Sequence, residues 1–212
     1  MIGMRIGGIS SVVALGAHCD DIAIGAGATL ARLCEDNPGL RVDAIVFAGG
    51  VAAREQEERS ALAALCIDAK LQITVLGLPD GRLPAHWDEV KNALTELRDR
   101  TTPDLLVAPH RHDAHQDHRT VAEITSTVFR NELVLGYEIL KWDGDLTQPA
   151  CYQPIPERLL ETKLSVLHEH YPSQHDKDWF DADTFRGLAR VRGVQCHARY
   201  AEAFHVEKWL LE

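Results

Sequence analysis

Two short segments concentrate the side chains that could bind a metal ion or transfer protons. Residues 17–21 read Ala-His-Cys-Asp-Asp and follow an apolar run, so an imidazole and two carboxylates stand where a buried strand is expected to end. Residues 109–118 hold four histidines within nine positions, and His115 and His118 share one face of the helix expected to begin there. A bound cation would remove the cost of crowding charge at the end of a buried strand.

Imidazole nitrogen and carboxylate oxygen form the ligand mixture of zinc sites, and a catalytic zinc ion takes three protein ligands and leaves a fourth position to water. His18, Asp21 and His118 would supply such a set. In the simpler alternative, the histidines lie on surface loops, while Asp20 and Asp21 only cap the helix that follows. The occurrence of both clusters after neighbouring strands favours the metal site.

The elements that position these clusters follow from the pattern of apolar residues. Short apolar runs alternate with segments of helical periodicity, which is typical of βα units around a parallel sheet. Strands are expected at about residues 11–16, 42–48, 72–76, 105–108 and 134–138, and helices at about 25–34, 55–66, 87–100 and 117–130. We therefore expect an α/β fold with a Rossmann-like, mostly parallel sheet and helices on both faces. Both clusters would then lie beyond the carboxyl ends of strands, where open parallel sheets bind ligands.

The last third of the chain is expected to cap the same domain, so that residues 1–212 form a single domain. A polar, proline-containing stretch at 142–156 predicts irregular structure, and Trp142 within it could line a pocket. Helices are expected near 157–171 and 183–191, and a closing strand at 201–211. This region is therefore predicted to be an irregular C-terminal cap.

Composition and charge exclude several classes of protein. The net charge of −10 leaves no basic surplus to neutralise phosphates, so nucleic acid is not an expected partner. The five cysteines are scattered and form no C-x-x-C pair, which predicts reduced thiols in a cytoplasmic protein. No stretch reaches the ~18 uninterrupted apolar residues of a membrane span.

The N-terminus imitates a secretory signal, because Arg5 precedes the apolar residues 6–17. The His-Cys-Asp-Asp segment would then stand beside the cleavage site. If those residues bind metal, the apolar run is instead a buried first strand, which is the interpretation we expect.

The two clusters resemble the signatures of one enzyme family. Residues 17–21 are similar to the A-H-P-D-D motif of the LmbE/PIG-L deacetylases, and residues 115–118 are similar to their H-x-D-H motif. The resemblance continues through nearly the whole chain, at residues 54–57, 76–81, 173–174 and 202–204. It implies a Rossmann-like fold and one zinc ion per chain, or another divalent metal, held by His18, Asp21 and His118.

The same resemblance implies the roles of three further residues. Asp20 would be the general base, and His115 would stabilise the developing charge, with Asp117 orienting His115 and holding it protonated. The chemistry agrees, because zinc lowers the pKa of its bound water towards ~7 and a nearby carboxylate can then accept the proton. The implied reaction is removal of an N-acyl group, typically N-acetyl, from a small sugar or sugar conjugate through a metal-bound water.

Two residues outside the signatures are candidates for contact with the substrate. Arg54 carries a guanidinium that could bind carboxylate or hydroxyl groups, although a solvated charge at a helix start is an equal alternative. Asp80 lies in a Pro-Asp-Gly turn and could bind a sugar hydroxyl, although aspartate is also favoured in such turns.

Two positions depart from the family pattern. Cys19 stands where the family usually has proline, and its thiol is expected to point into the packing rather than to a metal. Asp113 stands where some members place a mobile tyrosine, two residues before His115. Whatever that tyrosine contributes must be absent here or supplied by another group.

Other functions remain open on the sequence alone. One alternative is an amidase for a non-sugar or thiol-conjugate metabolite, and another is a carbohydrate-binding protein without catalysis. The strand followed by Gly25-Ala26-Gly27 also suggests a nucleotide-binding oxidoreductase, but polar residues intervene and position 30 is leucine instead of the expected glycine. The sequence leaves the oligomeric state undetermined, a homo-oligomer included.

Overall fold

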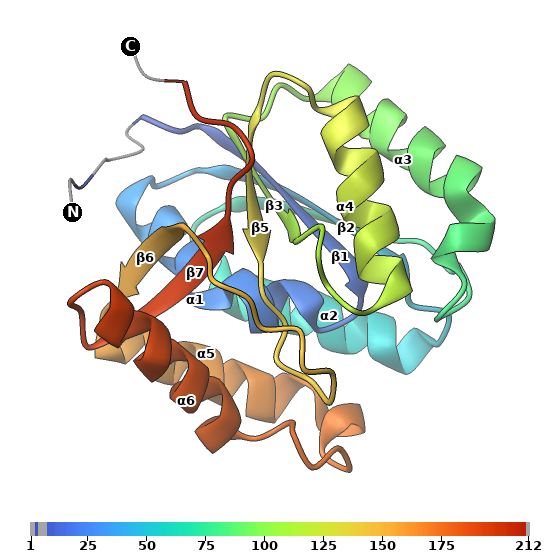
Figure 1. Ribbon diagram of the computed structural model, residues 1–212. Helices are drawn as coiled ribbons and strands as arrows, with labels where there is room; N and C mark the ends of the chain where they lie inside the picture. The colour runs from blue at the N-terminus through green and yellow to red at the C-terminus, as the bar shows by residue number, and fades with distance from the viewer. Residues whose placement is uncertain (1–2, 4–7, 211–212) are drawn as a thin grey trace.

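A mixed β-sheet runs through the centre of the protein, whose computed structural model describes residues 3 and 8–210 (Figure 1). Among these residues the sheet has seven strands in the order β3-β2-β1-β4-β5-β7-β6. The strands are β1 Ser11–His18, β2 Arg41–Ala48, β3 Lys70–Val75, β4 Leu105–Pro109, β5 Leu133–Tyr137, β6 Cys151–Ile155 and β7 Tyr200–His205. The first five are parallel, while β7 runs antiparallel to both β5 and β6.

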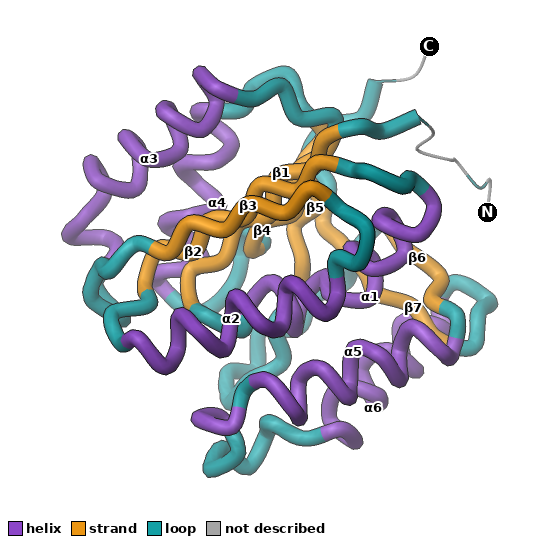
Figure 2. The backbone as a smooth tube through the Cα atoms, turned by 180° about the vertical axis from the view of Figure 1, so that it is seen from behind, coloured by secondary structure: helices purple, strands orange, loops and turns teal. Residues whose placement is uncertain are grey.

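Helices cover both faces of the sheet, as expected. On one face lie α1 (Asp21–Asp36), α2 (Ala52–Leu65) and α5 (Glu157–His170), with α6 (Ala182–Gln195) packed on α5 and β7. On the other face lie α3 (Trp87–Arg100) and α4 (Gln116–Val128), as the views in Figures 1 and 2 show. Two short 3₁₀ helices, η1 (Leu83–His86) and η2 (Pro172–Gln174), precede α3 and follow α5.

The central strand β1 divides the core into two parts. Val12 and Ala14 pack towards α1 and α2, whereas Val13 and Leu15 pack towards α3 and α4. A parallel strand buried on both faces needs an unbroken apolar run, because successive side chains point to opposite faces. The apolar run at the N-terminus is therefore strand from Ser11 onward, as expected, while Arg5 and Ile6 lie outside the described residues.

The expected elements up to residue 138 are confirmed within a few residues, and so are the helices expected near 157–171 and 183–191, which are α5 and α6. The stretch at 142–156 is less irregular than expected. Residues 151–155 form the edge strand β6, and the last third of the chain completes the sheet through β6 and β7 with α5 and α6 outside it. Pro154 argued against a strand, but an edge strand tolerates proline because one side of its backbone has no partner. The expected strand at 201–211 ends at His205.

The glycines that suggested a nucleotide-binding loop lie within helix α1 and serve packing. A Cβ atom on Gly25 would stand 2.2 Å from the ring of Tyr137. That ring is fully buried, and its hydroxyl donates a hydrogen bond to the carbonyl oxygen of Leu15 at 2.6 Å. Gly25 therefore lets β5 and β1 approach α1 closely. No helix among the described residues is long and apolar enough to cross a bilayer.

This packing generates a stability prediction. Gly25→Ala should lower the free energy of unfolding by about 1–3 kcal/mol, because the new methyl group must displace a buried ring. The matched control is Gly187→Ala in α6, where a Cβ meets nothing within 4 Å. That change should stabilise the protein by about 0.5–1 kcal/mol through helix propensity. Urea denaturation measures both, and a Gly25→Ala protein as stable as wild type would contradict the packing role.

Candidate metal and catalytic site

The carboxyl ends of β1 and β4 bring the two sequence clusters together. β1 ends at His18, and only Cys19 and Asp20 separate it from α1, which begins at Asp21. β4 pairs with β1 in parallel, so the loop after β4 and the first turn of α4 reach the same edge of the sheet. His118 lies in that first turn and is buried.

Three donor atoms from these loops form a nearly regular triangle. The Nδ1 atom of His18 lies 3.2 Å from the Nε2 atom of His118, and the Asp21 Oδ2 atom lies 3.5 Å and 3.3 Å from these two nitrogens. Zinc bonds of ~2.0–2.1 Å in a tetrahedral arrangement separate neighbouring ligand atoms by about 3.3 Å. The structure therefore brings together the three side chains expected to bind metal, at a spacing that one small cation would satisfy.

Carboxylates surround the two imidazoles on their far sides. Asp113 Oδ2 lies 2.9 Å from His118 Nδ1, while Asp117 Oδ2 and Asp80 Oδ1 lie 3.1 Å and 3.0 Å from His18 Nε2. A carboxylate that accepts the second N–H of an imidazole fixes its tautomer and leaves the other nitrogen free to bind metal. The three contacts therefore direct His118 Nε2 and His18 Nδ1 into the same triangle.

Negative charge dominates the electrostatics of this cluster. Burial opposes protonation of His18, but hydrogen bonds to Asp117, Asp21 and Asp80 raise its pKa to about 12. Burial likewise opposes protonation of His118, and the charge of Asp21 with the hydrogen bond to Asp113 raises its pKa to about 9. Without a metal, protons must neutralise these carboxylates. A divalent cation would provide the same compensation.

Two other groupings of possible ligands share His18. One combines it with His115 and His118, and the other with Asp80 and Asp117, the donor atoms of each group lying within 4.8 Å of one another. In the first, however, His115 Nδ1 already accepts a hydrogen bond from the backbone N–H of Asp117. In the second, Asp117 also accepts the backbone N–H groups of Gly81 and Leu83. These hydrogen bonds favour the triangle over the two other groupings.

Asp20 occupies a strained backbone conformation next to the triangle. Its φ of 126° and ψ of −26° lie outside the regions that residues with a side chain adopt easily. Such outliers cost roughly 1–3 kcal/mol and persist only where neighbouring groups hold them. Arg54 provides this support, because its Nη2 group donates to the carbonyl oxygen of Cys19 and to the Asp20 carboxylate at 3.1 Å.

The environment of Asp20 suits a proton acceptor. Burial and the neighbouring charge of Asp21 raise its pKa to about 6, against the opposing charge of Arg54. A carboxyl group with its pKa near the working pH is the most effective general base.

Arg54, expected to contact the substrate, makes several contacts within the protein. Besides Asp20, its guanidinium donates to the Ser173 hydroxyl at 2.9 Å and lies 3.6 Å from Glu57. These contacts fix the loop after β1 and join it to the segment after α5. Sequence reasoning missed this role because Ser173 is more than a hundred residues away.

The expected pairing of Asp117 with His115 also differs from the structure. The Asp117 carboxylate contacts His18 and two backbone N–H groups, and only its backbone N–H meets His115. Burial and the charges of His118 and His18 lower the pKa of His115. The Asp117 carboxylate therefore makes no hydrogen bond that would hold a proton on His115, although its charge opposes the lowering of that pKa. The hydrogen bond at Nδ1 leaves Nε2 as the atom that can carry the proton.

The two departures from the family pattern have clear structural consequences. The Cys19 thiol is buried in the core, and burial raises its pKa to about 12. Asp113 lies between His118 and the Lys141 ammonium, at 2.9 Å and 3.0 Å. In the sequence, only the position of Asp113 just before the second signature, residues 115–118, pointed to its contact with His118.

Asp80 lies at the mouth of the site. Its side chain is 81% exposed, although one oxygen contacts His18. It could therefore also meet a substrate. His110 is buried and stacks on His205, with ring centroids 4.6 Å apart.

Glu58 is a buried acid that sequence reasoning missed. The Tyr171 hydroxyl donates to its Oε2 atom at 2.7 Å, while its buried Oε1 atom has no partner among the described residues. Burial raises its pKa to about 8, against the hydrogen bond from Tyr171. Glu58 is therefore protonated near neutral pH.

A pH prediction follows from this group. The folded protein retains a proton on Glu58 that the unfolded chain loses near pH 4.5, so the contribution of Glu58 to stability should fall as pH rises from about 4.5 to 8. Glu58→Gln should remove that fall. Urea denaturation between pH 5 and 8, with Glu123→Gln as the surface control, measures the difference. A constant difference between the variant and wild type would contradict the raised pKa.

The carboxylates behind the imidazoles generate a second site prediction. Asp113→Asn should weaken zinc binding about 10–100-fold, because His118 loses the carboxylate that orients it. Competition with a fluorescent zinc chelator measures the affinity. Asp183→Asn on the exposed side of α6 is the control for loss of one negative charge. Unchanged zinc affinity in Asp113→Asn would remove Asp113 from the site.

Comparison with known proteins gives a consistent result. A family model described as "PIG-L: GlcNAc-PI de-N-acetylase" matches residues 13–129, which is more than half of the chain. The "Uncharacterized deacetylase YaiS" of Escherichia coli K12 is 28% identical over 172 residues, covering 75% of this chain and 89% of that protein.

Solved structures share the fold across almost the whole chain. An N,N'-diacetylchitobiose deacetylase from Pyrococcus horikoshii gives a TM-score of 0.72 at 21% identity, with 94% of this chain and 84% of that chain covered. The 4-carboxy-2-hydroxymuconate hydratase GalB from Pseudomonas putida KT2440 also gives a TM-score of 0.72, at 16% identity and with coverage of 96% and 98%. Proteins with different reactions thus share this fold, so the reaction has to be argued from the site.

Proposed function

Because the chain belongs to the PIG-L family of GlcNAc-PI de-N-acetylases, we propose that it is a zinc-dependent deacetylase that removes an N-acetyl group from a small sugar or sugar conjugate. The observation that carries the proposal is the triangle of His18 Nδ1, Asp21 Oδ2 and His118 Nε2 beside the strained, buried Asp20. Two nitrogens and one oxygen fit zinc, and a fourth position remains for water or substrate.

When bound, a zinc ion would act as a Lewis acid on the amide carbonyl and make water acidic enough to lose a proton near neutral pH. Asp20 is the proposed acceptor of that proton. Arg54 holds its carboxylate at 3.1 Å, so the base stays next to the ligands instead of turning into solvent. The raised pKa of Asp20 lets the same carboxyl group return the proton to the leaving amine.

His115 is proposed to stabilise the charge on the substrate oxygen. Its ring lies 4.8 Å and 4.9 Å from the rings of His18 and His118, centre to centre. Because Nδ1 accepts from the backbone of Asp117, Nε2 carries the proton and can donate to a developing oxyanion. Asp117 then acts on the reaction through His18, and not as the partner of His115.

Asp80 is the proposed contact for a sugar hydroxyl, since its carboxylate is exposed at the mouth of the site. Arg54 is assigned to positioning Asp20. The acidic net charge agrees with a small-molecule substrate. A reducing, cytoplasmic setting, a possible homo-oligomer and the identity of the metal stay predictions.

The test measures zinc content and amine release on the same samples. Asp20→Asn should keep about one zinc per chain and lose about 10²–10⁴ of the rate, because the amide preserves shape but accepts no proton. Asp183→Asn should match wild type in both. The rates are measured on a panel of N-acetyl sugars and their conjugates.

Two results would overturn the proposal. A wild-type protein freed of metal by a chelator that still releases amine at the original rate would exclude the metal mechanism. An Asp20→Asn protein with full zinc and full activity would return Asp20 to the role of a helix cap.

A further inference from the structure

An exposed tryptophan is fixed in place at the rim of the proposed site. The Trp142 side chain lies in the loop between β5 and β6 and is 70% exposed. Its Nε1 group donates to Asp178 Oδ1 at 2.8 Å, and its ring meets that of Trp179 edge to face, with centroids 6.0 Å apart. These two contacts hold the ring in one orientation, so that its exposed face is a flat apolar surface of fixed position.

The loop that carries Trp142 is attached to the metal site on one side. The Lys141 ammonium lies 3.0 Å from Asp113, the carboxylate that contacts His118. Lys141 also lies 2.6 Å from Asp145, whose carboxylate accepts the backbone N–H of Ala114 at 2.7 Å. Residues 141–145 are therefore tied to the loop before His115, so the position of Trp142 relative to the donor triangle is defined.

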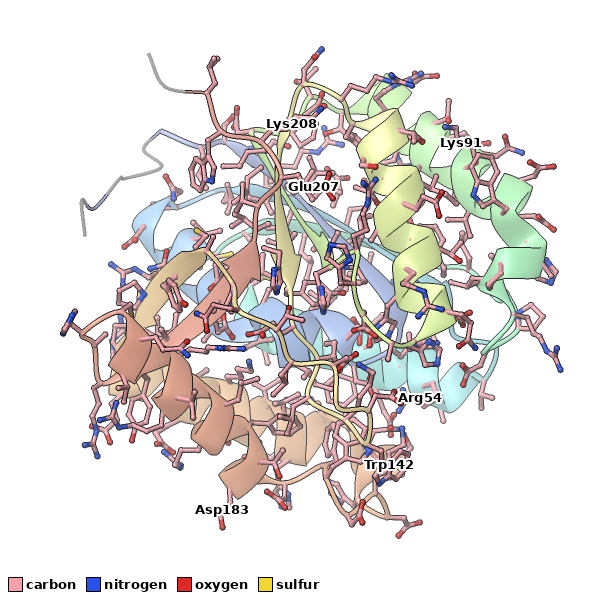
Figure 3. The ribbon with its side chains drawn as sticks, in the orientation of Figure 1. Arg54, Lys91, Trp142, Asp183, Glu207 and Lys208 are labelled. Carbon is pink, nitrogen blue, oxygen red and sulfur yellow. The ribbon has the colours of Figure 1, made fainter. Side chains whose placement is uncertain are left out.

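The partner of Trp142 is attached to the other side of the site. Asp178 lies in the segment that follows η2, and Ser173 in η2 accepts a hydrogen bond from Arg54, which holds Asp20. In the view of Figure 3, Arg54 and Trp142 are both seen at the same edge of the molecule.

The chemistry around Trp142 indicates which kind of ligand would lie on it. Its neighbours at the rim are charged: Lys177 lies 5.3 Å from the ring centre of Trp179, and Asp178 holds the indole N–H. A lipid or acyl chain would need a continuous apolar groove. A sugar ring instead offers an apolar C–H face for the indole and hydroxyl groups for the charges beside it, and a rigid ring binds it at little entropic cost.

We propose that the exposed face of Trp142 binds a second sugar ring, next to the one that carries the acetamido group. This inference rests on the proposed function and makes the substrate an N-acetylated saccharide of at least two rings. The acetamido group of the first ring lies at the donor triangle with a hydroxyl near Asp80. The second ring extends outward over residues 141–145 and lies on Trp142.

The test compares a one-ring and a two-ring substrate. Amine release is measured with N-acetylglucosamine and with its β-linked disaccharide for wild type, Trp142→Ala, Trp142→Phe and Trp209→Ala. Trp142→Ala should raise KM for the disaccharide about five- to tenfold, as expected for loss of one stacking contact. It should leave kcat for the disaccharide, and both kcat and KM for the monosaccharide, unchanged. Trp142→Phe keeps a flat aromatic ring, so KM for the disaccharide should stay close to the wild-type value. Trp209, 42% exposed in the segment after β7, is the matched control and should have no effect.

Binding separates this proposal from the proposed function. The fully deacetylated disaccharide is titrated into the zinc-loaded proteins by calorimetry, which needs no turnover. Binding that weakens in Trp142→Ala supports the second-ring site even if no sugar is deacetylated, in which case only the proposed function fails. Two results would overturn the second-ring site whether or not the enzyme is active. One is an equal change in KM for the monosaccharide and the disaccharide in Trp142→Ala. The other is an affinity for the disaccharide that does not depend on Trp142.

Discussion

The imidazole of His18 is the group on which the site depends, because both of its nitrogens are committed. Nδ1 faces His118 and Asp21, whereas Nε2 faces Asp117 and Asp80. Only a ring fixed in one orientation can contact His118 and Asp21 with one nitrogen and Asp117 and Asp80 with the other. That fixation comes from the fold, since His18 is the last residue of the central strand, with buried neighbours on both faces of the sheet.

A surplus of buried carboxylates makes the same site a receptor for positive charge. The acids that follow the strands contact imidazoles and backbone N–H groups, and their hydrogen bonds and charges raise the pKa values of His18 and His118 to about 12 and about 9. A metal ion would take over this compensation and release those protons. The strain at Asp20 belongs to the same arrangement, because Arg54 holds the carboxylate beside the triangle in a conformation it would not adopt alone.

The parts of the molecule that local pattern controls could be predicted from the sequence. Buried parallel strands require unbroken apolar runs, so β1 to β5 and the loops after them were located within a few residues. The His-x-x-Asp and His-x-x-His spacings then indicated which side chains would meet at one edge of the sheet. The edge strand β6 could not be predicted, because its proline and polar residues are explained only by its place beside β7.

Contacts between distant segments were the other limit. Arg54 reaches Ser173, and Lys141 reaches Asp113, through pairings that no local pattern indicates. The carboxylate of Asp117, expected beside its near neighbour His115, lies against His18. In each case the tertiary structure decides which of several possible hydrogen bonds forms.

The central claim is that His18, Asp21 and His118 together hold one metal ion. X-ray absorption at the zinc edge of the loaded protein tests it most directly, because the signal reports the number and type of ligand atoms. We expect two imidazole nitrogens with one carboxylate and water oxygens at about 2.0–2.2 Å, and the loss of one imidazole in His118→Ala. A spectrum with sulfur at about 2.3 Å, or one that His118→Ala leaves unchanged, would contradict it.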